Sequence, residues 1–169
     1  PAVRMLARPE HAAEIAASVL REDPLNLLVR YLSGAPDFFG SLHSEPAQSV
    51  LDLSFDLASM GQYGRVIDLL DGFADARPEA CSAMLFFSAA YFKNLSGREF
   101  GRELAEAEQA PVGLTFPFRR EEADVLRFAM GQGSARASLL LGFLLYDRRH
   151  YEEAGELFEQ YTKLRPEDP

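Results

Sequence analysis

Two apolar stripes follow one another in the last part of the chain, and this pattern constrains the fold more than any other feature of the sequence. Steps of three and four residues place each stripe on one face of an α-helix. A polar stretch at 147–150 separates the stripes, and Pro166 ends the second one. The pattern predicts a helix–turn–helix pair over residues 135–168. The stripes are Leu141, Leu144 and Leu145, then Tyr151, Ala154, Phe158 and Tyr161.

Further copies of this pair precede it at matching offsets. Residues 47–80 carry a full copy with Gly61 in the predicted turn, and residues 81–111 carry a less regular one. In the latter, Ser96 and Glu99 are predicted to form a capping box for its second helix. Residues 9–24 match a second helix alone. The apolar positions are Ala12, Ala16 and Val19; Leu53, Val66, Leu70 and Phe73; and Met84, Phe87, Tyr91, Phe100, Leu104 and Ala107.

The prolines that end these units are separated by 54, 33 and 55 residues. Only the middle interval fits one repeat, so the outer intervals hold inserted segments. Both insertions carry helical stripes, and Ala, Leu, Glu and Arg outweigh β-branched residues throughout. We therefore expect one all-α domain with inserted helices at 25–46 and 112–134, and eight to ten helices in total. The prolines are Pro24, Pro78, Pro111 and Pro166.

The spacing of Leu141-Gly142, Tyr151, Ala154, Phe158 and Pro166 resembles the tetratricopeptide repeat (TPR). This resemblance implies an α-α superhelix of stacked helix pairs, with Gly142 and Ala154 small where two helices touch. The 116–119 stretch and residues 141–154 further resemble the C-terminal TPR arrays of large bacterial proteins. Those proteins begin with a mutarotase-like β-sandwich domain of unknown function. Because the chain begins at Pro1, we expect it to be a fragment of a longer protein.

The resemblance also implies a groove lined by the first helix of each pair. Phe55, Phe92, Phe143 and Tyr146 would be its aromatic anchors. In the alternative interpretation, the inserted helices cover these residues and make them core. The carboxylate-binding clamp of chaperone-adaptor repeats is missing, because the corresponding positions hold Leu, Phe and Ala. The groove candidates are Gln48, Leu51, Phe55, Ala58, Ser59, Ser82, Leu85, Ala89, Phe92, Lys93, Arg136, Leu139, Phe143, Tyr146 and Asp147.

Residues that could carry catalysis are better explained as structural. The three histidines lie far apart, so no metal site is expected. The four glutamates between 152 and 159 fit a solvated helix face, and the single cysteine, Cys81, fits a buried position. Residues 131–134 fit a helix end followed by Ser134 as an N-cap, not a phosphate loop. The Arg119-Arg120 and Arg148-Arg149 doublets are expected to form local salt bridges. We expect neither enzymatic activity nor a cofactor.

Charge and hydropathy limit the partners. With 17 basic and 26 acidic residues, the net charge is −9, which argues against nucleic-acid binding through a general basic field. The longest nearly apolar run, 137–146, is too short to span a membrane. A lone cysteine fits a reducing compartment, so we expect a cytoplasmic protein unless a targeting signal lies upstream of Pro1.

These features together predict a protein-interaction or scaffolding module. Its partner would be a protein or peptide, or another domain of the same chain, and a homo-oligomer is a further option. The alternative is an accessory or oligomerisation segment of a larger carbohydrate-active enzyme.

Overall fold

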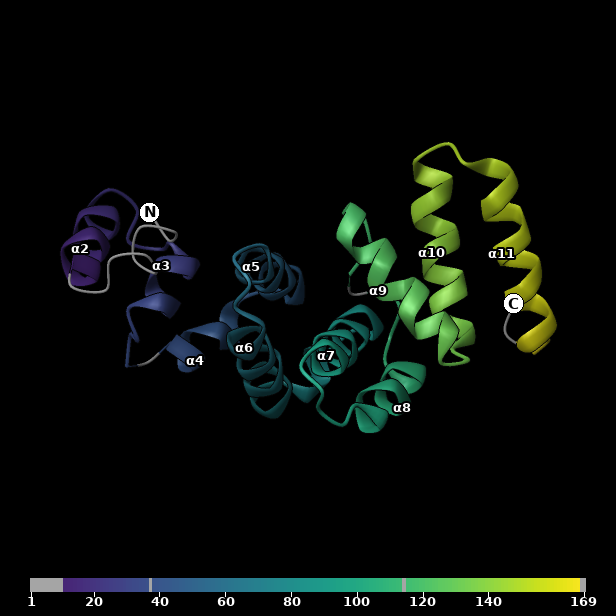
Figure 1. The fold of residues 1–169 in the computed structure, drawn as a ribbon, viewed down its shortest axis with the longest axis horizontal. Helices are drawn as coiled ribbons and strands as arrows, with labels where there is room; N and C mark the ends of the chain where they lie inside the picture. Colours follow the sequence, from purple (N-terminus) through teal and green to yellow (C-terminus); the bar gives the residue numbers. More distant parts are fainter. Residues whose placement is uncertain (1–10, 37, 114, 168–169) are drawn as a thin grey trace.

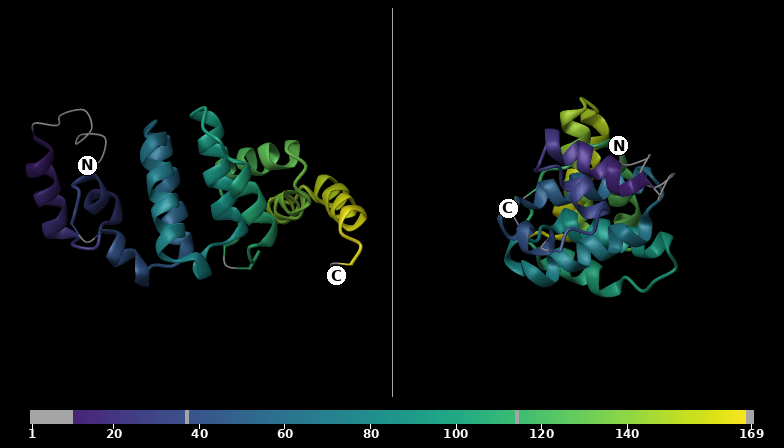
Figure 2. Two further views of the ribbon diagram at one scale, coloured as in Figure 1. Left: turned by 90° about the horizontal axis from the view of Figure 1, so that it is seen from below. Right: turned by 90° about the vertical axis from the view of Figure 1, so that its left-hand side faces the viewer.

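The computed structural model describes residues 11–36, 38–113 and 115–167. Over these residues the chain forms ten α-helices and no strands, which confirms the all-α prediction. The chain progresses along the long axis from α2 at one end to α11 at the other, with α6 level with α5 and α9 beside α8 (Figure 1), and Figure 2 shows the same progression from below. They are α2 (Ala12–Glu22), α3 (Leu27–Leu32), α4 (Phe38–Ser41), α5 (Ala47–Ser59), α6 (Tyr63–Ala76), α7 (Ala83–Leu95), α8 (Gly101–Gln109), α9 (Arg120–Gly131), α10 (Ala135–Asp147) and α11 (Tyr151–Leu164).

Three helix pairs occupy the predicted repeats: α5 with α6, α7 with α8, and α10 with α11. The inserted segments are helical as well. The first holds α3, α4 and the 3-10 turn Leu42–Ser44, and the second holds α9. The half repeat corresponds to α2, although residues 9 and 10 lie outside the described part of the chain. Helix α9 packs against both α7 and α10 and so lies between these two helices, while α10 also contacts α8 (Figure 1).

The link between α9 and α10 forms as the sequence predicts. Helix α9 ends at Gly131, and Gly133 adopts a φ of 90°, which only glycine adopts without strain. The Ser134 hydroxyl then accepts a hydrogen bond from the backbone N–H of Ala137 at 3.0 Å. This N-cap satisfies one of the free donors at the start of α10.

The predicted capping box at Ser96 and Glu99 is wrong. Ser96 is instead the C-cap of α7, and α8 begins only at Gly101 without a side-chain cap. Gly97 takes a φ of 65°, and the N–H of Arg98 donates to the carbonyl of Lys93 at 2.9 Å. The backbone of this segment therefore closes α7, and the Ser96 side chain lies a turn too early to cap α8.

One continuous core runs from α4 to α10, and a small second cluster joins α2 to α3. Gly142 of α10 lies against the ring of Phe158 in α11, and Ala154 is fully buried. Gly72 of α6 lies similarly against the ring of Phe39 from α4. Small residues thus mark close contacts, as predicted for Gly142 and Ala154. Within the described ranges, no helix combines the length and the apolar character that a membrane span requires.

Candidate functional site

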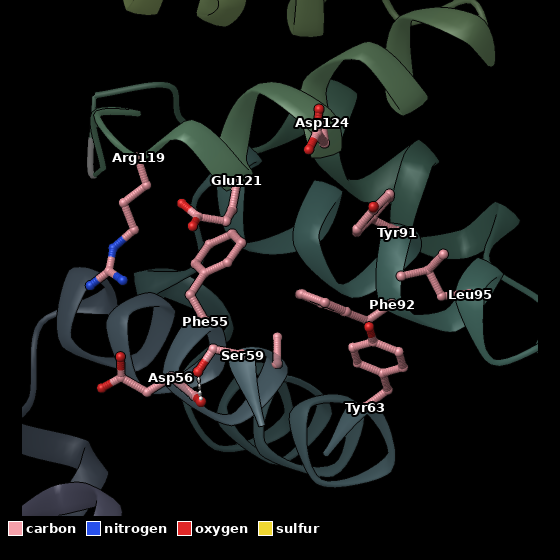
Figure 3. A pocket seen from close by; sticks show the side chains of 11 residues that line it. Phe55, Asp56, Ser59, Tyr63, Tyr91, Phe92, Leu95, Arg119, Glu121 and Asp124 are labelled. Atoms are coloured by element: carbon pink, nitrogen blue, oxygen red, sulfur yellow. Dashed lines mark hydrogen bonds between the residues drawn. The ribbon is translucent and has the colours of Figure 1, made fainter. Parts of the chain in front are cut away.

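A cavity of about 400 Å³ opens between α5, α6, α7 and the start of α9. We call it the aromatic pocket; Figure 3 shows its lining side chains. Helices α5 and α6 form one wall, α7 forms another, and α9 crosses above them. The lining residues are Phe55, Asp56, Ala58, Ser59, Tyr63, Tyr91, Phe92, Leu95, Arg119, Glu121 and Asp124.

Four aromatic rings in contact form the apolar part of the pocket. Phe92 lies at their centre, with its ring centroid 5.9 Å from that of Phe55, 5.8 Å from Tyr63 and 5.4 Å from Tyr91. Phe92 is buried, whereas Tyr63 is 38% exposed and Leu95 is 46% exposed. The pocket therefore has a packed aromatic floor and an apolar rim that solvent reaches.

The polar part of the pocket is mostly acidic. Asp56 and Glu121 are exposed, and neither carboxylate forms an ion pair within the described part of the chain. Asp124 pairs with Arg127 of the same helix at 3.3 Å. The one lining cation, Arg119, reaches away to Asp52 at 2.9 Å. This pairing corrects the prediction of local salt bridges for the first arginine doublet, because Asp52 belongs to α5.

Glu122 sets the position of the start of α9. Its Oε2 atom accepts hydrogen bonds from the backbone N–H groups of Phe118 and Arg119, both at 2.7 Å. The side chain is fully buried, and this burial raises the pKa of the Glu122 carboxyl although the two N–H groups oppose the shift. The hydrogen bonds hold the first turn of α9, and with it Glu121 and Asp124, above the pocket.

Some groove candidates of α5 and α7 line the aromatic pocket, whereas others are buried in the core. Phe55, Ser59 and Phe92 line the aromatic pocket, together with Ala58. Leu51 and Leu85 are fully buried in the core, so the prediction that they line an accessible groove is wrong. The same correction applies to Ser82 and Ala89, which are also buried.

Two polar candidates of these helices have partners inside the chain. The Gln48 amide donates to Asp52 at 3.0 Å. The Lys93 ammonium lies 2.9 Å from both Asp71 and Glu103. Burial opposes its charge, but the hydrogen bonds to the two carboxylates prevail and raise the pKa of Lys93. Lys93 therefore joins α6, α7 and α8 rather than facing the pocket.

The α10 candidates do not reach the aromatic pocket, because α9 lies between α7 and α10 (Figure 1). Arg136 donates to the carbonyl of Ala110, and Leu139 is half-buried. Phe143 lies between Phe116 and Phe158, with centroid distances of 5.6 and 5.4 Å. Tyr146 and Asp147 are exposed near the end of α10. The prediction of one groove shared by all three repeats is therefore wrong.

Sequence reasoning missed several lining residues. Tyr63 and Tyr91 occupy stripe positions, which indicated helix packing rather than an open surface. Glu121 and Asp124 belong to the inserted helix, whose location the repeat spacing does not give. The available signal was Phe55, the cluster of aromatic residues in α7 and the acidic residues 121 and 122. It would have suggested the chemistry of the pocket but not its position.

The titratable residues outside the pocket that the sequence singled out are Cys81, His150 and the glutamates between 152 and 159. In the described part of the chain, no group of three His, Cys, Asp or Glu side chains is arranged to hold a metal ion. Cys81 is buried, as predicted, and its thiol lies 3.4 Å from the Arg77 carbonyl oxygen. Burial raises the pKa of Cys81 to about 11, which disfavours the thiolate that a nucleophile needs. His150 and the glutamates 152–159 are exposed, as predicted for a solvated turn and helix face.

No protein-family model matches this chain, and no curated protein sequence matches it.

Proposed function

We propose that this chain is a non-catalytic interaction module that binds a peptide segment of a partner protein in the aromatic pocket. The observation that carries the proposal is the open cavity of about 400 Å³ at which Tyr63 and Leu95 surround the buried Phe92. A cavity of this size accommodates one or two side chains of a partner. Aromatic rings held in place by packing lose little entropy on binding, so they contribute strongly to interface affinity.

The arrangement of the helices supports a TPR-type superhelix as the scaffold. Three helix pairs with short turns follow in sequence order, and Gly142 lies directly against the ring of Phe158 within the last pair. In the proposed scaffold, α9 is an insertion that converts part of a shared groove into a local pocket. A reducing, cytoplasmic setting belongs to the same proposal and is supported by the single, buried Cys81.

The test is a selection of random peptides displayed on phage against the immobilised chain, followed by affinity measurement on variants. Leu95→Gln removes an apolar group from the pocket rim. Leu164→Gln is the matched control, because both leucines end a helix and they are 46% and 54% exposed. We expect selected peptides to lose about tenfold in affinity for Leu95→Gln, which corresponds to about 1.4 kcal/mol, and none for Leu164→Gln.

Two results would overturn the proposal. The first is a selection that yields no binding peptide. The second is a set of selected peptides whose affinity changes equally in the two variants, since binding would then not depend on the pocket. Circular dichroism of both variants establishes that the helices remain folded.

A further inference from the structure

We propose that the aromatic pocket receives an arginine side chain of the bound segment. This inference rests on the proposed function and specifies its ligand chemistry. The guanidinium would stack on the rings around Phe92, and the carboxylate of Glu121 at the start of α9 would pair with it. The Asp56 carboxylate of α5 points away from these rings (Figure 3), so Asp56 adds only to the acidic surroundings of the site.

The charge of the lining favours a cation. Among the described residues that line the pocket, three carry carboxylates and one, Arg119, carries a guanidinium that is already paired with Asp52. Asp56 also lines a neighbouring hollow that contains Asp23 and Asp52, so the acidic surface continues along α5. The whole chain carries a net charge of −9, which adds a long-range attraction for basic segments.

The chain already holds one guanidinium against the same cluster of rings. The Cζ atom of Arg119 lies 5.9 Å from the ring centroid of Phe55 and 5.5 Å from that of Phe118. These distances are within the range of cation–π attraction. Tyr63, Tyr91 and Phe92 extend the aromatic surface beyond Phe55, away from Arg119. A second guanidinium would find the same kind of surface there.

Arginine fits this site better than an apolar side chain or lysine. An apolar anchor would take Glu121 out of water without giving it a partner, which costs free energy. Lysine carries a compact, strongly hydrated charge, whereas the guanidinium is planar and more weakly hydrated. It can therefore stack on a ring with its face while its edge donates hydrogen bonds to a carboxylate.

The test is a titration of the ¹⁵N-labelled chain with N-acetyl-arginine amide, followed by NMR. N-acetyl-citrulline amide is the matched probe, because citrulline has nearly the same shape without the charge. We expect millimolar binding of the arginine probe, with shifts concentrated at the amides of residues that line the aromatic pocket. We expect at least tenfold weaker binding of citrulline, and a weaker arginine interaction as salt increases.

Matched variants test whether the Glu121 carboxylate binds the arginine probe. Glu121 and Glu152 are the second residues of α9 and α11, and both are exposed. Glu121→Gln is expected to weaken arginine binding by about fivefold, which is the size of an exposed ion pair. Glu152→Gln is expected to leave it unchanged. Equal binding of arginine and citrulline, or equal effects of the two variants, would overturn the inference.

The two proposals fail in different ways. Selected peptides that depend on Leu95 but contain no basic residue would overturn the arginine inference and leave the proposed function standing. Conversely, the arginine probe could bind at the pocket while the selection yields no peptide. That result would support arginine binding at this site and overturn the proposed role in peptide binding.

Discussion

The ring of Phe158 lies so close to the backbone of Gly142 that a Cβ atom placed on Gly142 would be 2.5 Å from Cε1 of that ring. The half-buried ring of Phe158 also contacts that of Phe143, with 5.4 Å between the ring centroids. The absence of a side chain at Gly142 is therefore what allows α10 and α11 to approach here.

Gly142→Ala is expected to destabilise the chain by about 1 kcal/mol. Alanine improves helix propensity by about 1 kcal/mol, but overpacking against Phe158 costs more, typically 1–3 kcal/mol. Gly155→Ala in α11 is the matched control, because a Cβ there meets no atom within 4 Å. Its expected effect is a stabilisation of up to about 1 kcal/mol. Urea denaturation measures the free energy of unfolding of both variants. A change in the same direction for the two variants would contradict the close packing of Phe158 against Gly142.

Lys93→Met is expected to destabilise the chain by about 3 kcal/mol, because it leaves the buried Glu103 carboxylate without its main partner. Lys163→Met provides the control, since Lys163 pairs with Glu159 at 3.7 Å and both side chains are 77% exposed. Its cost should not exceed about 0.5 kcal/mol. Adding Glu103→Gln to Lys93→Met should recover part of the loss. A small effect of Lys93→Met in urea denaturation would show that the ion pairs of Lys93 contribute little to stability.

Glu122→Gln is expected to change how stability depends on pH. Because the folded pKa of Glu122 is raised above the unfolded value of about 4.3, the native state holds this proton more tightly. The stability that this provides is complete below the unfolded pKa and is lost as pH rises through the folded pKa. Glutamine lacks this loss while its oxygen can still accept from Phe118 and Arg119. The free energy of unfolding of the variant, relative to the natural chain, should therefore rise with pH, whereas a constant difference would contradict the prediction.

Cys81 is expected to react slowly with a chromogenic disulfide reagent. With its pKa raised to about 11, the thiol is almost entirely protonated at pH 8. The folded chain should react at least about 100-fold more slowly than the chain in urea, where the pKa returns to about 8.5. The rate in the folded state should keep rising with pH up to the range of that pKa. A plateau near pH 9 would show that the thiol is not perturbed.

The helices were largely predictable because their signals are local. The stripe in α11 lies within one stretch of chain, and Pro166 follows it directly. Ser134 was recognisable as an N-cap because its partner, Ala137, is three residues away. Where two local signals competed, at Ser96, the prediction was wrong, because the glycine that follows closes α7 before α8 can begin.

The candidate site was only partly predictable, since it depends on which neighbour covers each apolar face. Phe55 and Leu51 lie one helical turn apart on α5 and both are buried, yet only Phe55 lines the pocket. The repeat spacing does not predict where the inserted helix α9 packs. Its position removes Phe143 from the groove and brings Glu121 to the pocket.

By itself, the sequence determined that this chain forms pairs of α-helices and that Gly142 and Ala154 lie where two of them meet, because helical period, caps and small residues act over a few positions. Only the tertiary structure decided that Arg119 pairs with Asp52, that Lys93 links three helices and that four aromatic rings surround one pocket. These relationships join residues far apart in the chain, and burial and pairing depend on the packing of whole helices rather than on the pattern within any one of them.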